Sequence, residues 1–180
     1  MSHLPHLIVV DVETSGLDPL THDVLEVAAI DLATGEELHF APTPTRPDWL
    51  TAADPEALQV NRYYERGIYA HQVDVETTGR RWATVAKMLE GNILAGANPW
   101  FDAAFVDAAL RHWGITPARR HQLRDLATYA SGILRLDPAK PASLSSVLDM
   151  LGIINRDPHS ALGDATATAL MASGPEQGFQ

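Results

Sequence analysis

The sequence contains no cysteine, and its apolar runs are short. The absence of cysteine excludes disulfides, a thiolate nucleophile and a cysteine-ligated zinc site. The run Leu7–Val10 falls far short of the roughly 20 residues that a membrane span needs. The first residues lack a basic segment followed by an apolar one, so no secretory signal is readable. We therefore expect a cytoplasmic protein without a membrane partner.

Basic residues are scarce at the start of the chain. Residues 1–60 hold 11 Asp and Glu against one Arg, whereas residues 61–180 hold 12 acidic and 12 basic residues, so the whole net charge of −10 lies in the first third. Proteins that bind nucleic acid usually carry a basic surface, and this charge argues mildly against one. The acidic charge does not exclude a site that holds the end of a nucleic-acid strand through divalent cations, because bound cations reverse the local charge.

The length of 180 residues predicts a single domain over 1–180, with a core over about 6–172 and a frayed tail over 174–180. Apolar runs bounded by turn formers predict an antiparallel meander of strands over 6–13, 24–32 and 36–41. Helical periodicity and capping residues predict later elements. These are a helix that starts at Asp54, helices over 79–90, 99–113, 127–134, 143–151 and 160–172, and strands over 93–97 and 122–126.

The order of these elements indicates the fold class. Four prolines within residues 42–55 predict an irregular surface crossing after the meander. Strands and helices alternate after it. The sequence therefore predicts an α/β fold with a mixed five-stranded sheet, whose first three strands are antiparallel, and helices on both faces.

A seven-residue motif occurs twice. Val10–Gly16 and Val73–Gly79 differ at one position. The first copy ends an apolar strand and thus places its carboxylates at the end of a sheet. The second copy leads into an amphipathic helix, where Glu76 and Thr77 are interpreted as first-turn and capping residues. We expect chemistry from the first copy only.

Asp11 and Glu13 lie one residue apart on the first predicted strand, so both side chains point to one face of the sheet. Two carboxylates in one site repel each other, and a divalent cation with oxygen ligands removes that cost. The alternative is a solvated strand end that leads into a turn. For the bare pair of carboxylates, that alternative is the more common one.

Three further residues complete a candidate set. Asp102 lies beside the apolar stripe of its helix and can face the strand ends, although a first-turn Asp also favours the helix dipole. Asp164 lies in the first turns of the last helix, where the alternative is a solvated residue. His159 follows Pro158 on the entry loop, free to swing toward Asp164 unless it is an ordinary surface histidine.

Four carboxylates and one mobile histidine are the components of two-metal phosphodiester hydrolysis. In that chemistry two ions stabilise the attacking and leaving oxygens. His159 takes a proton from the attacking water as general base. Each residue alone is a weak signal, and their order and contexts make the set informative.

The sequence resembles the DEDDh 3′→5′ exonucleases, a ribonuclease-H-like group that includes the proofreading epsilon subunit, ribonuclease T and oligoribonuclease. The resemblance is carried by the motifs Val10–Leu17, Ala97–Asp102 and His159–Ala165, and it extends from residue 6 to about residue 172. The histidine of the third motif distinguishes this branch from the one with tyrosine. The helix over Ser143–Ile153 also resembles the family's helix before that motif.

The resemblance implies a role for each matched residue. Two Mg²⁺ or Mn²⁺ ions are then bound by Asp11, Glu13, Asp102 and Asp164, with His159 as the base. Thr14 and Leu17 match positions that contact the terminal nucleotide, with Leu17 wedged against the base. Asn98 and Phe101 match the second-motif Asn and Phe, and Trp100 beside them is the best candidate for stacking on a base. Ala97 and Pro99 depart from the family pattern, in which His and a small residue are common.

The sequence thus predicts a 3′→5′ exonuclease that acts on single-stranded DNA, releases nucleoside 5′-monophosphates and serves proofreading or repair, with a DNA polymerase as a candidate partner. One alternative is an RNA-trimming exoribonuclease or oligoribonuclease, although Leu162–Asp164 is closer to the DNA-proofreading and ribonuclease T patterns. Another is a non-catalytic, polymerase-associated binding module. The intact carboxylate set argues against that module, because unpaired buried carboxylates destabilise a fold.

Overall fold

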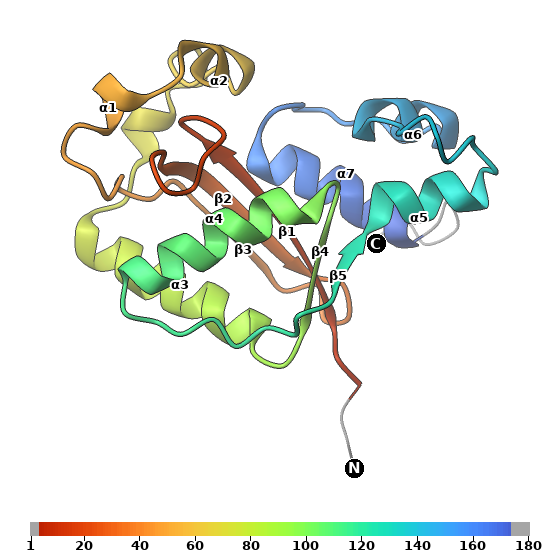
Figure 1. Ribbon diagram of the computed structural model, residues 1–180, viewed down its shortest axis with the longest axis horizontal. Helices are drawn as coiled ribbons and strands as arrows, with labels where there is room; N and C mark the ends of the chain where they lie inside the picture. The colour runs from red at the N-terminus through yellow and green to blue at the C-terminus, as the bar shows by residue number, and fades with distance from the viewer. Residues whose placement is uncertain (1–3, 174–180) are drawn as a thin grey trace.

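The computed structural model describes residues 4–173, so the tail predicted over 174–180 lies outside the described residues. A five-stranded sheet with the order β3-β2-β1-β4-β5 forms its centre, and helices cover both faces (Figure 1). The predicted α/β class and mixed sheet are therefore confirmed. The strands are β1 (Leu7–Thr14), β2 (Val24–Asp31), β3 (Glu37–Phe40), β4 (Ile93–Gly96) and β5 (Leu123–Asp125).

β1 is the central strand. It pairs antiparallel with β2 and parallel with β4, while β3 and β5 extend the two edges. Because β1 and β4 run in the same direction, their carboxyl ends meet at one edge of the sheet. Open α/β sheets bind ligands outside the carboxyl ends of their parallel strands. The end of β1 and the start of the helix after β4 are thus brought together.

The helices largely follow the predicted spans. They are α1 (Trp49–Ala52), α2 (Pro55–Val60), α3 (Val75–Leu89), α4 (Pro99–His112), α5 (Leu126–Ile133), α6 (Leu144–Leu151) and α7 (Ala161–Ser173), with a 3-10 helix over Ile68–His71. Among the described residues, none of these helices combines the length and apolar character that a bilayer crossing requires.

Two predictions about the helices were wrong. The proline-rich crossing contains α1, a single turn without a side-chain cap or a buried residue, which leaves no pattern to detect. α3 begins at Val75 rather than at residue 79, because the Asp74 side chain accepts a hydrogen bond from the Thr77 backbone N–H at 2.8 Å. Asp74 is therefore the N-cap, and Thr77 is the residue that it caps. Glu76 does lie in the first turn, as predicted.

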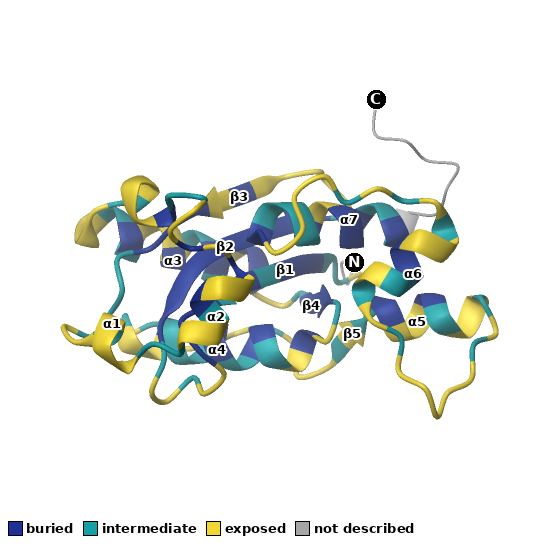
Figure 2. Cartoon of the chain, turned by 90° about the horizontal axis from the view of Figure 1, so that it is seen from above, coloured by how far each residue is buried: buried dark blue, intermediate teal, exposed yellow. Residues whose placement is uncertain are grey.

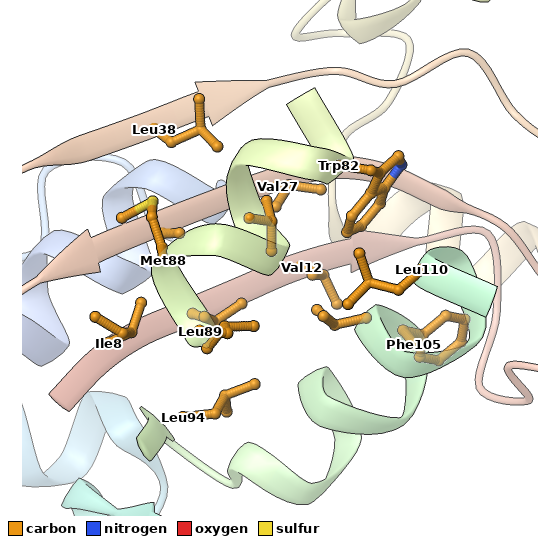
Figure 3. Packing of buried hydrophobic residues seen from close by; sticks show 14 of the residues in the cluster. Ile8, Val12, Val27, Leu38, Trp82, Met88, Leu89, Leu94, Phe105 and Leu110 are labelled. Atoms are coloured by element: carbon orange, nitrogen blue, oxygen red, sulfur yellow. The ribbon is translucent and has the colours of Figure 1, made fainter. Parts of the chain in front are cut away.

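Two apolar layers enclose the sheet. On one face α3 and α4 pack on the sheet through Trp82 and Phe105, both about 1% exposed (Figure 3). On the other face α5, α6 and α7 pack against Val9 and its neighbours. Side chains alternate along β1, so Val10 and Val12 belong to the first layer and Val9 to the second. Asp11 and Glu13 share the alternation of Val9 and hence face the side of the sheet that α7 covers.

The segment from α2 to the start of α3 covers the carboxyl end of β1. Leu58, Tyr63 and Ile68 pack with Leu25 of β2 in a third apolar cluster. The Asn61 side-chain amide donates to the Thr14 carbonyl at 3.1 Å. Figure 2 shows α2 beside the largely buried strands β1 and β2. This segment therefore sits over the strand end that carries the first motif.

Candidate active site

Three carboxylates converge at the end of β1. Asp11 and Glu13 come from the strand, and Asp164 comes from the first turn of α7. One oxygen of each lies within 4.8 Å of the others, and all three side chains are partly buried. The strand pair and the late-helix Asp, which are about 150 residues apart in sequence, therefore meet as one cluster.

Asp102 approaches the same strand end from α4. Its side chain is 4% exposed, and its Oδ1 accepts a hydrogen bond from the Val12 backbone N–H at 2.9 Å. Its charge is one of the causes that raise the pKa of Asp11. The prediction that Asp102 faces the strand ends is confirmed, and one of its two oxygens is occupied by β1.

Burial and mutual repulsion hold protons on this cluster. Burial, followed by the charges of Asp102 and Glu13, raises the pKa of Asp11 well above its usual value. Burial, followed by the charges of Asp164 and Glu26, raises the pKa of Glu13 to about 8. Burial likewise raises the pKa of Asp102 to about 7, against the lowering effect of the Val12 N–H. A bound cation favours the ionised forms and removes this repulsion.

The donor set indicates which cation suits the cluster. All four side chains offer carboxylate oxygens, and oxygen ligands suit Mg²⁺ and Mn²⁺ rather than softer metals. The cluster thus fits divalent metal binding.

Asn155 supports Asp164. The Asn155 side-chain amide donates a hydrogen bond to Asp164 Oδ1. Burial raises the pKa of Asp164, and this hydrogen bond, together with the nearby His159 charge, acts in the opposite direction. Asn155 leaves one Asp164 oxygen available and orients it. No pattern in the sequence points to this residue, because an asparagine in a turn-rich loop is common.

His159 lies on the loop before α7, as predicted. The residue is exposed and has a positive φ of 59°. Its charge acts on Asp164, so the imidazole lies within electrostatic reach of the cluster. A histidine so placed combines access to water with proximity to the carboxylates.

Comparison with known proteins identifies the family. The profile of an exonuclease family matches residues 8–172, from the start of β1 to the end of α7. The chain belongs to this exonuclease family. The match confirms the resemblance to the DEDDh 3′→5′ exonucleases of the ribonuclease-H-like superfamily.

Similar proteins include two polymerases. The PolC-type DNA polymerase III of Thermotoga petrophila is 29% identical over 175 residues, and that of Thermotoga maritima is 30% identical. Each match covers 90% of this chain and 11% of the polymerase. The exonuclease chain thus spans about a ninth of the length of these relatives.

Solved structures of E. coli exonuclease I share the fold. Its complex with a dT13 oligonucleotide has a TM-score of 0.75 at 21% identity, and a zinc-bound complex with single-stranded DNA has 0.75 at 22%. Both matches cover 94% of this chain and 40% of exonuclease I. Because the identity is low, this similarity shows the fold alone.

A buried ion pair lies behind the carboxylates of the exonuclease. Glu26 stands opposite Glu13 in the β1–β2 register and is 5% exposed. The Arg66 guanidinium donates to both Glu26 oxygens at 2.8 Å, and His39 Nε2 lies 2.8 Å from one of them. Burial raises the pKa of Glu26, but these hydrogen bonds outweigh it and leave that pKa below its usual value.

Sequence reasoning missed Glu26 and Arg66. One signal for Glu26 was present, since it is a lone carboxylate within the apolar run Val24–Ile30. A charge in a fully buried strand requires a partner. The run does not identify that partner, because Arg66 lies 40 residues further along the chain.

The predicted substrate contacts divide into exposed and internal groups. Leu17 is 75% exposed in the β1–β2 loop, and Trp100 is 63% exposed at the start of α4. Phe101 packs inward against Phe105, with 4.9 Å between ring centroids. Thr14 is buried, and its hydroxyl donates to the Gly16 carbonyl at 2.7 Å. Asn98 is exposed, with a positive φ of 61° immediately before α4.

Proposed function

We propose that this exonuclease domain, with its core over about 6–172, removes nucleotides from the 3′ end of single-stranded DNA and releases nucleoside 5′-monophosphates. The observation that carries the proposal is the meeting of Asp11, Glu13 and Asp164 oxygens within 4.8 Å, beside the buried Asp102. His159 lies on the exposed loop next to them. This combination provides negative ligands for cations and a base with access to water.

Asp11, Glu13, Asp102 and Asp164 are the residues that would hold two divalent cations, Mg²⁺ or Mn²⁺. Such ions, when bound, stabilise the charge that develops on the scissile phosphate and its leaving oxygen. The protein's own part is to fix the ligands: Val12 orients Asp102, and Asn155 orients Asp164. Oriented ligands raise metal affinity and fix coordination geometry.

His159 acts as the general base in this proposal. Its imidazole takes a proton from the water that attacks the terminal phosphodiester, and the exposed loop lets it return the proton to solvent. Leu17 wedges against the terminal base, and Trp100 offers a ring for stacking. In this proposal Thr14, Asn98 and Phe101 also contact the terminal nucleotide.

Two comparisons favour DNA as the substrate. The relatives from Thermotoga are DNA polymerases by name, and several exonuclease I structures contain single-stranded DNA or DNA oligonucleotides. Proofreading or repair in the cytoplasm, with a DNA polymerase as partner, is the corresponding setting.

A labelled-strand assay tests the function. A 5′-labelled single-stranded DNA is incubated with the protein and Mg²⁺, Mn²⁺ or a chelator, and a matched RNA strand and dinucleotides are run beside it. We expect a metal-dependent ladder that shortens from the 3′ end, lost in Asp164→Ala. Asp74→Ala, which changes the carboxylate of the second motif copy, serves as the matched control and should keep the ladder.

Each remaining outcome has a definite meaning. Full activity in Asp164→Ala contradicts the assignment of the site. A strong preference for RNA, above all for RNA dinucleotides, replaces DNA by RNA as the substrate. Failure on both strands, together with co-purification with a polymerase, identifies a binding module instead.

A further inference from the structure

We propose that Arg62 and Arg66 are positioning residues that hold the loop before α7 so that His159 faces the carboxylate cluster. The inference rests on the proposed function, in which His159 is the base. Both arginines lie in the segment between α2 and the 3-10 helix, and the Arg66 backbone N–H donates to the Arg62 carbonyl at 2.8 Å. They are thus one turn apart and reach the same loop.

The arginine contacts cover three consecutive residues of that loop. Arg62 Nη2 donates to Asp157 Oδ1 at 2.7 Å and to the Pro158 carbonyl at 3.4 Å. Arg66 Nη1 donates to the His159 carbonyl at 3.0 Å. Guanidinium groups from a distant part of the chain therefore hold this loop from the Asp157 side chain to the His159 carbonyl.

Glu26 holds the backbone two residues after His159. Its Oε2 accepts a hydrogen bond from the Ala161 backbone N–H at 3.3 Å, while Arg66 holds both of its oxygens. The Arg66–Glu26 pair thus contacts the backbone on both sides of Ser160. Since Glu26 belongs to the central part of the sheet, the pair ties the loop to the strand next to β1.

The loop needs such support for two reasons. His159 has a φ of 59°, in the left-handed region that few residues with a side chain adopt. In addition, a groove of about 760 Å³ borders this stretch, with Ile154, Asn155 and Asp157 among its walls. Asp157, Pro158 and His159 are themselves exposed, so apolar packing restrains them little and polar contacts carry the restraint.

A second ion pair provides a matched control. Arg119 donates to both oxygens of Asp107 and is 16% exposed, close to the 15% of Arg66. Its carboxylate partner lies on α4 rather than beside His159. Loss of Arg119 removes a similar interaction from the fold without touching the His159 loop.

Kinetics test whether the arginines act through His159. Steady-state kcat and KM are measured for the parent, for each single variant and for His159→Ala combined with each arginine change. The single variants are Arg66→Met, Arg62→Gln, Arg62→Asp, Arg119→Met and His159→Ala, and Arg62→Asp is also combined with Asp157→Arg. We expect Arg66→Met to lower kcat by at least about tenfold, with KM changed by less than about threefold. In the His159→Ala background the same change should cost less than about twofold, because a positioning residue has nothing left to position.

The exposed pair gives a variant that keeps the fold. Arg62 and Asp157 are about half exposed, so Arg62→Gln removes little structure. We expect a smaller loss of kcat in Arg62→Gln and in Arg62→Asp, and recovery when Arg62→Asp is combined with Asp157→Arg. Arg119→Met should stay within about twofold of the parent.

Hydrogen exchange tests the restraint without relying on activity. The amides of Ala161, Gly163 and Asp164 are hydrogen-bonded at the start of α7. We expect them to exchange faster in Arg66→Met and Arg62→Gln than in the parent, with α4 unchanged. An inactive parent overturns the proposed function alone, and exchange still decides the restraint. Unchanged exchange, unchanged kcat in both variants, or losses that add fully to His159→Ala overturn the inference.

Discussion

At the scale of the residue, the four carboxylates are the same kind of group, but they have different hydrogen-bond partners in the structure. One oxygen of Asp102 accepts a hydrogen bond from the Val12 N–H, and one oxygen of Asp164 accepts from the Asn155 amide. The acidic residues themselves were predictable, since their types and spacing fit one chemistry. Their partners were not, because a backbone N–H and a loop amide carry no signal in a sequence pattern. Arg66 escaped prediction for the same reason.

Asp102 gives a prediction with opposite effects on stability and activity. In Asp102→Asn the new side-chain carbonyl can still accept from Val12, but a buried charge with a pKa of about 7 is gone. We expect metal-free protein at pH 8 to gain up to about 4 kcal/mol in unfolding free energy, and activity to fall at least about a hundredfold. Urea unfolding and the labelled-strand assay measure the two effects.

Asp107 provides the comparison on the same helix. It is ion-paired with Arg119 at 2.8 Å, so Asp107→Asn should lower stability and leave the exonuclease rate near that of the parent. A loss of stability in Asp102→Asn equal to that in Asp107→Asn would contradict the view that Asp102 is held at an electrostatic cost.

At the scale of the element, sequence patterns predicted the strands and most helices, and they failed for α1 and the 3-10 helix. α1 has no buried residue, and the 3-10 helix buries only Ile68, so neither shows an amphipathic stripe. Contacts with Leu25 and Tyr63 in the third cluster stabilise this region instead. Tertiary contacts of that kind are visible only once the chain is folded.

The start of α3 gives the element-scale prediction. Asp74 caps the helix through the Thr77 N–H and hydroxyl, and its carboxylate is exposed. We expect Asp74→Ala to lower the urea midpoint with an unchanged m value, because an N-cap is lost while the unfolding transition stays the same. Glu76→Ala, which removes only a surface pair with Arg80, should have a smaller effect. A reduced exonuclease rate in Asp74→Ala at full folding would give the second motif copy a role in the site.

At the scale of the whole molecule, the net charge was readable from the sequence, whereas the protonation of the site was not. Raised pKa values require that α4 and α7 close over the end of β1 from opposite faces of the sheet. Asp102 lies 91 residues after Asp11, and Asp164 lies 62 residues after Asp102. The pattern of residues in the sequence does not specify how deeply α4 and α7 bury these carboxylates.

This burial predicts how the stability of metal-free protein depends on pH. The pKa of Glu13 is about 8 in the folded protein against 4.5 as its ordinary value, and that of Asp102 is about 7 against 3.8. Between about pH 4.5 and pH 8 the folded state therefore retains protons that the unfolded state has released. Stability contributed by these groups is fully present below the unfolded pKa and is lost as the pH rises through the folded pKa.

We expect the unfolding free energy without metal to fall by several kcal/mol between pH 5 and pH 8. Urea titrations at several pH values, in a chelator, measure the slope. Glu13→Gln should flatten it, because one of the retained protons is no longer there to be released. Saturating Mg²⁺ or Mn²⁺ should restore stability at pH 8, where the cation replaces the protons on the same oxygens. A slope of the opposite sign would contradict the retention of protons by the buried carboxylates. A stabilisation by the cation that is undiminished in Glu13→Gln would show that Glu13 does not bind the metal.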